Sequence, residues 1–143
     1  PTFGVDRSVF AFLSDAYVEE EVATATPGEV KNRVVLKLHP TLAPIKVAVL
    51  PLSRNERLTP LAKRVFDTVR SSHVSNGMVQ YDDTQSIGRR YRRQDEVGTP
   101  LCITVDFESL DDDKITIRDR DTLTQNRVSI AKLVDELAKR LGN

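Results

Sequence analysis

The chain has 143 residues, enough for one hydrophobic core or for one domain with a piece of another. Its composition is that of a globular protein, and its formal net charge of +0 argues against a general basic coat for nucleic acid. The single cysteine excludes an internal disulfide and a cysteine-based zinc site, which favours a reducing, cytoplasmic setting. No apolar run approaches the roughly 20 residues of a membrane span. No signal peptide is recognisable, and the start at Pro1 rather than Met is expected of a fragment.

The first part of the chain predicts a helix, a loop, a short strand and a linker. Residues 4–23 favour a helix with an acidic end, because apolar side chains recur there at helical spacing. These side chains are Val9, Phe10, Leu13, Ala16 and Tyr17. A loop is expected over 24–32, where Thr, Pro and Gly gather, and a strand over 33–38. Two prolines within residues 39–44 indicate a linker, where we expect a domain boundary.

Beyond the linker, strands and helices are expected to alternate. Residues 45–50 form a nearly continuous apolar run, typical of a buried parallel strand. Residues 57–72 predict an amphipathic helix, with Pro60 in the first turn where no hydrogen bond is lost. Residues 78–83 predict the next strand.

The last third predicts a hairpin and a final helix. Residues 101–107 and 114–120 alternate apolar and polar side chains, so these two strands should pair antiparallel. A helix is expected over 130–141, with Ser129 as its N-cap and Gly142 closing its end. The order β-α-β-α-β-β-α predicts an α/β fold with a mixed sheet, parallel where helices cross over and antiparallel at the hairpin.

The stretch SIGRRYRRQDEVGTP, residues 86–100, concentrates charge in a predicted helix that its Gly-Thr-Pro end terminates. One interpretation is a solvated helix face with internal ion pairs, such as Arg92 with Glu96. The other is contact with nucleic acid, because a planar guanidinium binds phosphate or guanine edges bidentately and stacks on bases. Neighbouring carboxylates can accept from a cytosine amino group. Arg118 and Arg120, at the end of the predicted hairpin, add to the same cluster.

Other constellations of chemically active residues carry little signal. His39 and His73 have no partner at ligand spacing, so no metal site is predicted. The aspartates of 111–113 indicate a polar hairpin loop, and Cys102 indicates a packed side chain among alternating apolar residues. Neither a Ser-His-Asp order nor a Gly-rich phosphate loop is present in the sequence.

Four blocks of sequence carry a resemblance that covers essentially the whole chain. They are PTFGVDR, LAPIKVAVLPL, YDDTQSIGRRYRRQDEVGTPLCITVDF and ITIRDRDTLTQNRV. The first is similar to motif 3 of class II aminoacyl-tRNA synthetases without its leading glutamate. The others resemble successive blocks of the C-terminal anticodon-binding domain of the glycyl-tRNA synthetase family.

The resemblance implies a fold and a domain division. Residues 39–143 would be the anticodon-binding domain, a mixed five-stranded sheet with three helices. Residues 1–38 would be a remnant of the catalytic domain. Because the pattern yields four strands beyond the linker, the missing strand is expected near Arg33 to Leu38.

The resemblance also implies an activity and residues for it. The full-length protein would attach glycine to tRNA-Gly through a glycyl-adenylate, with ATP and Mg²⁺, as a cytoplasmic homodimer. Arg7 would be the catalytic arginine on the ATP phosphates, Gly4 would let the backbone approach the nucleotide, and Thr2 would lie near the substrate glycine. Motifs 1 and 2 are absent, so we expect this chain alone to be inactive in aminoacylation.

For tRNA, the resemblance implies that the charged cluster contacts the anticodon. The expected residues are Arg89, Arg90, Arg92, Arg93, Asp95, Glu96, Arg118 and Arg120. Glycine anticodons share two cytosines, whose amino groups Asp95 or Glu96 can accept from. One alternative is a non-catalytic, synthetase-like module that binds tRNA or other nucleic acid, although the intact Gly4 and Arg7 favour an active parent. Another is an α/β domain whose arginines serve ion pairs alone.

Overall fold

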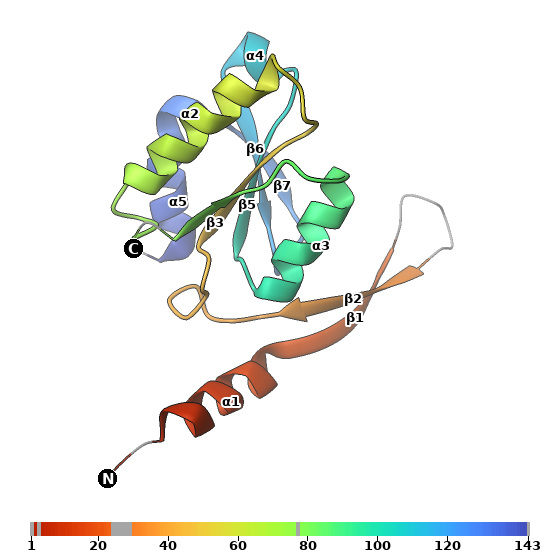
Figure 1. Ribbon diagram of the computed structural model, residues 1–143, viewed down its shortest axis with the longest axis vertical. Coiled ribbons are helices and arrows are strands. Elements are labelled where there is room, and N and C mark those ends of the chain that lie inside the picture. Colours follow the sequence, from red (N-terminus) through yellow and green to blue (C-terminus); the bar gives the residue numbers. More distant parts are fainter. Residues whose placement is uncertain (1, 3, 24–29, 77, 143) are drawn as a thin grey trace.

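The computed structural model describes residues 2, 4–23, 30–76 and 78–142. Its main body is a five-stranded sheet with helices on both faces, and a helix followed by a two-stranded sheet extends along one end of that body (Figure 1). The C-terminal helix belongs to the main body, whereas the N-terminal helix points away from it. Among the described residues, no helix is long and apolar enough to cross a membrane.

The large sheet is mixed and has the strand order β4-β3-β5-β6-β7. β3 pairs in parallel with β4 and β5, whereas β6 pairs antiparallel with β5 and β7. The strands are β3 (Val47–Pro51), β4 (Val79–Tyr81), β5 (Leu101–Val105), β6 (Lys114–Asp119) and β7 (Gln125–Ser129). The expected α/β fold with a mixed five-stranded sheet is therefore confirmed, as are the parallel crossovers and the β5–β6 hairpin.

The fifth strand is β7, and the expectation that it lies near residues 33–38 is wrong. β7 is an edge strand, and its first three residues are exposed while only Val128 and Ser129 are half-buried. An edge strand of this kind lacks the apolar run by which a buried strand is recognised in sequence. Residues 33–38 do hold a strand, but it belongs to the separate two-stranded sheet.

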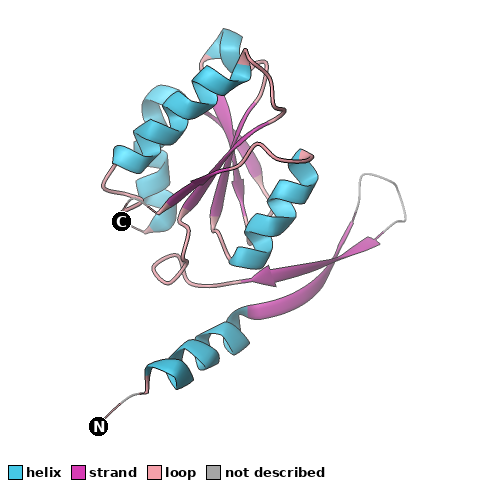
Figure 2. Cartoon of the chain, in the orientation of Figure 1, coloured by secondary structure: helices cyan, strands magenta, loops and turns pink. Residues whose placement is uncertain are grey.

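Three main helices sandwich the sheet (Figure 2). α2 (Leu58–Ser71) and α5 (Leu133–Leu141) pack on one face, where Val47 and Val49 join the main core. α3 (Ile87–Val97) packs on the other face, against Ala48, Leu50 and Cys102. Successive residues of β3 thus serve opposite faces, as the pleat of a strand requires. Full cover on both faces explains why β3 is apolar without a break.

The end of the chain differs in detail from the prediction. A short 3₁₀ helix (Ile130–Lys132) precedes α5, and Ser129 makes no side-chain capping hydrogen bond. Gly142 closes α5 with φ +75°, in the left-handed region that glycine adopts most readily, as predicted. The polar turn between β5 and β6 contains a single helical turn, α4 (Ser109–Asp112).

The N-terminal unit departs most from the sequence pattern. α1 (Val5–Ala16) ends before the acidic run that was expected to continue it, and β1 (Tyr17–Ala23) follows at once. β1 pairs antiparallel with β2 (Val30–Leu36), which places Glu20 opposite Arg33. Such cross-strand pairs of opposite charge stabilise an antiparallel sheet, which favours a strand over a helix for residues 17–23. Of the loop expected over 24–32, residues 24–29 lie outside the described residues, and the remainder belongs to β2.

Candidate nucleic-acid interface

α3 is held on the sheet by one apolar stripe and ends at a glycine. Ile87 and Tyr91, four residues apart, pack beside the Cys102 cluster, as their spacing predicted. Gly98 adopts φ +87° after the last turn, and its N–H donates to the Gln94 carbonyl at 3.0 Å. This left-handed cap stops the helix where the Gly-Thr-Pro sequence predicted.

Helical periodicity sorts the charged residues of α3 into two groups. Arg89, Arg92 and Glu96 are exposed, and Arg93 is half-buried on the same stripe. Arg90, Gln94 and Asp95 are buried on the side that faces the protein. Of the eight residues expected to contact tRNA, α3 therefore presents four to solvent: Arg89, Arg92, Arg93 and Glu96.

Arg93 of this exposed stripe is held by a neighbouring loop. Its Nη2 lies 2.5 Å from Asp82 Oδ2 and donates to the Thr84 carbonyl at 3.1 Å. Burial acts to raise the pKa of Asp82, but hydrogen bonds from Thr84 and the charge of Arg93 outweigh it and lower that pKa below its ordinary value. The Asp82 carboxylate therefore stays ionised and orients the Arg93 guanidinium.

Arg90 has an internal role. Its side chain is 1% exposed, and its guanidinium donates to four backbone carbonyls. These belong to Pro51, to Asp82 at 3.1 Å, and to Leu52 and Gln85 at 3.2 Å. Arg90 therefore ties together the loops that follow β3 and β4, and it supports the surface rather than presenting its charge there.

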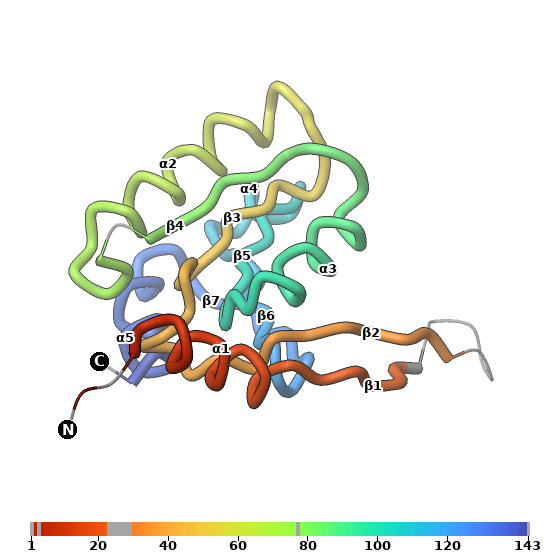
Figure 3. Tube along the Cα trace, turned by 60° about the horizontal axis from the view of Figure 1, so that its bottom comes forward, coloured from red at the N-terminus to blue at the C-terminus, as the bar shows by residue number. Residues whose placement is uncertain are grey.

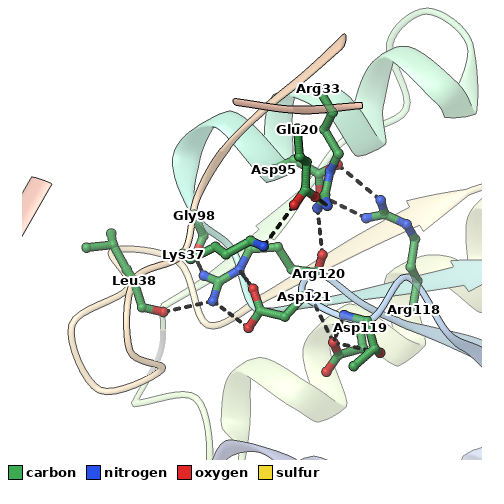
Figure 4. Close-up of polar contacts among 11 residues, drawn as sticks. Glu20, Arg33, Lys37, Leu38, Asp95, Gly98, Arg118, Asp119, Arg120 and Asp121 are labelled. Atoms are coloured by element: carbon green, nitrogen blue, oxygen red, sulfur yellow. Dashed lines mark hydrogen bonds and ion pairs between the residues drawn. The ribbon is translucent and has the colours of Figure 1, made fainter. Parts of the chain in front are cut away.

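Asp95 is the centre of a second buried cluster (Figure 4). It is 3% exposed and accepts from Nη1 and Nη2 of Arg118 on β6 at 2.9 and 3.0 Å. Its Oδ2 also accepts from Nε of Arg33 on β2 at 2.9 Å. The Arg118 guanidinium lies 4.6 Å from the centre of the Tyr91 ring, a cation–π distance. Both carboxylate oxygens of Asp95 thus accept hydrogen bonds from arginines of the same chain.

Arg120 is likewise enclosed. It donates to the carbonyls of Gly98 at 2.7 Å and Leu38 at 2.9 Å, and it forms two hydrogen bonds with Asp121 at 2.8 and 2.9 Å. The hydrogen bond from Arg120 is the main reason why the pKa of Asp121 lies below its ordinary value. Arg90, Asp95, Arg118 and Arg120 are therefore candidates for holding the interface in shape, and not for direct contact with tRNA in this conformation.

The carboxyl ends of the parallel strands supply surface features that the sequence pattern missed. A strand was expected over residues 101–107, but β5 ends at Val105 and Phe107 is 43% exposed. Leu52, also exposed, is joined to this region because its N–H donates to the Val105 carbonyl at 2.8 Å. Exposed Arg54 follows in the same loop. Aromatic and arginine side chains at such a surface suit the stacking of unpaired bases.

The residues expected at an ATP site lie in a different part of the molecule. Thr2, Gly4 and Arg7 are all exposed, at the end of α1 that points away from the five-stranded sheet (Figure 1). Gly4 is the N-cap of α1 and provides no side-chain hydrogen bond to its first turn. Phe10, 74% exposed, is one of several apolar side chains that α1 leaves open to solvent.

Neither a reactive cysteine nor a metal-binding cluster of acidic and histidine side chains is found among the described residues. Burial raises the pKa of the Cys102 thiol to about 12, so this cysteine is a packed, unreactive side chain, as its position in the sequence indicated. Among the described residues, no three His, Cys, Asp or Glu side chains gather in a group that could hold a metal ion.

Comparison with known proteins identifies the fold. The model of the anticodon binding domain family matches residues 46–140. The chain belongs to this family. A prolyl-tRNA synthetase from Cryptosporidium parvum has the same fold, with a TM-score of 0.67 and 20% identity over 75% of this chain and 22% of its own.

Comparison with curated relatives narrows the family further than the fold does. Glycine–tRNA ligase from Streptomyces coelicolor is 52% identical over 141 residues, which is 99% of this chain and 30% of that protein. The glycine–tRNA ligase from Cutibacterium acnes is 53% identical over 141 residues, 99% of this chain and 29% of its own length. The chain thus spans about 30% of the length of the curated relatives it matches. The resemblance to the glycyl-tRNA synthetase family is confirmed, and the match corresponds to the C-terminal portion.

Proposed function

We propose that this chain is the C-terminal part of a glycine–tRNA ligase and that its own activity is to bind the anticodon region of tRNA-Gly. The observation that carries the proposal is the exposed arginine stripe on α3, within a domain of the anticodon-binding family. Identity of 52% to a glycine–tRNA ligase over 99% of the chain supports glycine as the amino acid.

Binding would use two kinds of contact. Arg89 and Arg92 extend into solvent and can pair with backbone phosphates, while Arg93 is held by Asp82 in the fixed orientation that base recognition requires. Glu96 lies on the same stripe and can accept from a cytosine amino group. Phe107 offers a surface on which an unpaired base can stack. A local arrangement of this kind needs no overall positive charge, consistent with the net charge of +0.

The exposed start of α1 supports a role in the ATP site of the full-length enzyme. The first N–H groups of a helix attract anions, and no side chain caps them here. A Cβ at Gly4 would meet no atom within 4 Å, so ligand approach to this backbone is open. Arg7, in the first turn, would hold the ATP phosphates, and Thr2 would lie near glycine. With Mg²⁺, bound ATP would supply the adenylyl group that activates the glycine carboxylate, with pyrophosphate as the leaving group.

The apolar surface of α1 supports a larger parent protein. Val5, Phe10 and Phe12 are exposed here, and the chain covers only 30% of a full-length relative. Apolar patches of this kind mark sites of contact with further protein. We propose that the remaining part of a catalytic domain covers α1, with residues 1–38 as the piece of that domain included here. The full-length enzyme would act as a homodimer in the cytoplasm, and the isolated chain would not charge tRNA.

The proposed contact is tested with Arg89→Ala and a matched variant on the other face of the sheet, Arg64→Ala on α2. Each phosphate contact to a single strand contributes about −0.7 to the slope of log K against log salt. We expect Arg89→Ala to weaken binding of tRNA-Gly and to reduce that slope by about this amount. Arg64→Ala should change neither quantity. Equal behaviour of the two variants would argue against the α3 interface.

A further inference from the structure

A cluster of buried charges joins the two sheets, and the proposed tRNA contact makes no use of it. Arg33 on β2 donates Nε to Asp95 at 2.9 Å and Nη2 to the Arg120 carbonyl at 2.6 Å. Asp95 on α3 also holds both Nη atoms of Arg118 on β6. One carboxylate therefore links an arginine of the two-stranded sheet to an arginine of the five-stranded sheet (Figure 4).

The β2 side of this link is itself fixed. The third guanidinium nitrogen of Arg33, Nη1, donates to Glu20 on β1. Glu20 also accepts from Lys37 Nζ at 2.8 Å, and this hydrogen bond is the main cause of its lowered pKa. Every nitrogen of the Arg33 guanidinium is thus used, and one side chain ties β1, α3 and the end of β6 together. A planar guanidinium whose three nitrogens are all engaged fixes geometry as well as contributing energy.

The link lies between the two regions that the proposed function assigns to tRNA and to ATP. Asp95 is near the C-terminal end of α3, and the exposed arginines Arg89 and Arg92 precede it on the same helix. β1 continues from α1 with no residue between them, and Arg7 is in the first turn of α1. In Figure 3, β1, β2 and α1 run as one continuous arm beside the end of α3.

We propose that the Arg33–Asp95 pair is a positioning device that fixes the orientation of the anticodon-binding domain relative to α1. Arg33 is then a positioning residue through which anticodon recognition on α3 affects the chemistry at Arg7. This inference rests on the proposed function. The physical basis is that a buried ion pair strongly resists loss of either partner, because the remaining charge is left uncompensated. Other orientations of the two units that break the pair are therefore disfavoured.

The variant that tests this is Arg33→Gln in the full-length enzyme. It cuts the link between the sheets but leaves Asp95 paired with Arg118, so the five-stranded sheet keeps its own ion pair. The matched control is Arg127→Gln, which removes an arginine that binds Asp106 and Asp112 within the five-stranded domain. Hydrogen exchange in β5 and β6 of both variants should match the wild type and show that this domain is folded.

The readout is the ratio of kcat/KM for tRNA-Gly with its native anticodon to that with both anticodon cytosines changed. Glycine-dependent ATP–pyrophosphate exchange without tRNA is measured beside it. We expect Arg33→Gln to lower the ratio roughly 5- to 150-fold, the usual range of coupling between sites, with exchange little changed. Arg127→Gln should keep the wild-type ratio.

Two results would overturn the inference. One is an Arg33→Gln enzyme that keeps the wild-type ratio, and the other is an equal loss of exchange and tRNA charging, which indicates a general folding defect. Failure of the proposed function is distinguishable from both, because it would appear as a wild-type enzyme with no preference for the native anticodon.

Discussion

At the scale of single residues, the arginines of α3 divide by burial. Arg89 and Arg90 are adjacent in sequence, yet Arg89 is exposed and Arg90 is buried against four backbone carbonyls. A buried guanidinium whose two Nη atoms bond backbone carbonyls organises the backbone around it, whereas an exposed one is available to a ligand. The same residue type is therefore buried at one position and accessible at the next.

This difference predicts opposite effects of the same substitution. Arg90→Met should lower the free energy of unfolding by about 3 kcal/mol, because buried carbonyls after β3 and β4 lose their donor. Arg89→Met should change it by less than about 0.5 kcal/mol, as expected for an exposed site, while weakening tRNA binding. Denaturant unfolding and tRNA titration of both variants check this. A stable Arg90→Met protein would show that Arg90 does not hold the loops.

Part of this division could have been predicted from the sequence. Ile87 and Tyr91 define the packed stripe of α3, and positions three and four residues from them include Arg90, Gln94 and Asp95. Helical spacing thus separates these residues from the exposed arginines. The partner of Asp95 on β2 could not be found in this way, because Arg33 lies 62 residues away and pairs through tertiary packing alone.

At the scale of elements, β2 approaches the end of α3 so closely that Gly98 is required. A Cβ at Gly98 would lie 2.9 Å from the Leu36 carbonyl oxygen, and the residue has φ +87°. Both the contact with β2 and the left-handed backbone exclude a side chain. The sequence predicted that this glycine ends the helix. In the structure, the same glycine also lets β2 pack closely against the end of α3.

Two glycine substitutions test this contact. Gly98→Ala should lower the free energy of unfolding by about 2 kcal/mol, since it combines strained backbone with a clash against β2. Gly88→Ala in the same helix should raise it by about 0.5–1 kcal/mol, because a Cβ there meets nothing within 4 Å and alanine favours the helix. Thermal or denaturant unfolding measures both. Equal effects of the two substitutions would contradict the proposed packing.

Elements with a clear hydrophobic period could be predicted, and those held by polar contacts could not. β3, α2 and α5 bury continuous or amphipathic patterns, and their positions follow from the sequence. β1 carries Glu19, Glu20 and Glu21, which were expected to be the acidic end of a helix but pair with β2 instead. β7 is an exposed edge strand with no apolar pattern. Both exceptions depend on pairing with the adjacent strand, which the periodicity of the segment itself does not reveal.

At the scale of the whole molecule, contacts through β2 connect the two regions that the proposed function assigns to tRNA and to ATP. The exposed arginine stripe belongs to a five-stranded α/β domain, and the proposed ATP-contacting residues lie at the start of the projecting α1 and just before it. Fold class and family follow from the sequence blocks and are confirmed. The division of the chain at residues 38 and 39 stays a prediction. The ion pair between Arg33 on β2 and Asp95 on α3 shows that residues on the two sides of this position pack together.

The most direct test of the central claim is binding of the chain to tRNA-Gly and to a copy with both anticodon cytosines changed, each at two salt concentrations. A shared loss of affinity with rising salt is expected from phosphate contacts alone. We predict that the native anticodon is bound more tightly at both concentrations, because base contacts persist where phosphate contacts weaken. Equal affinity for the two tRNAs at both salt concentrations would contradict anticodon recognition by this domain.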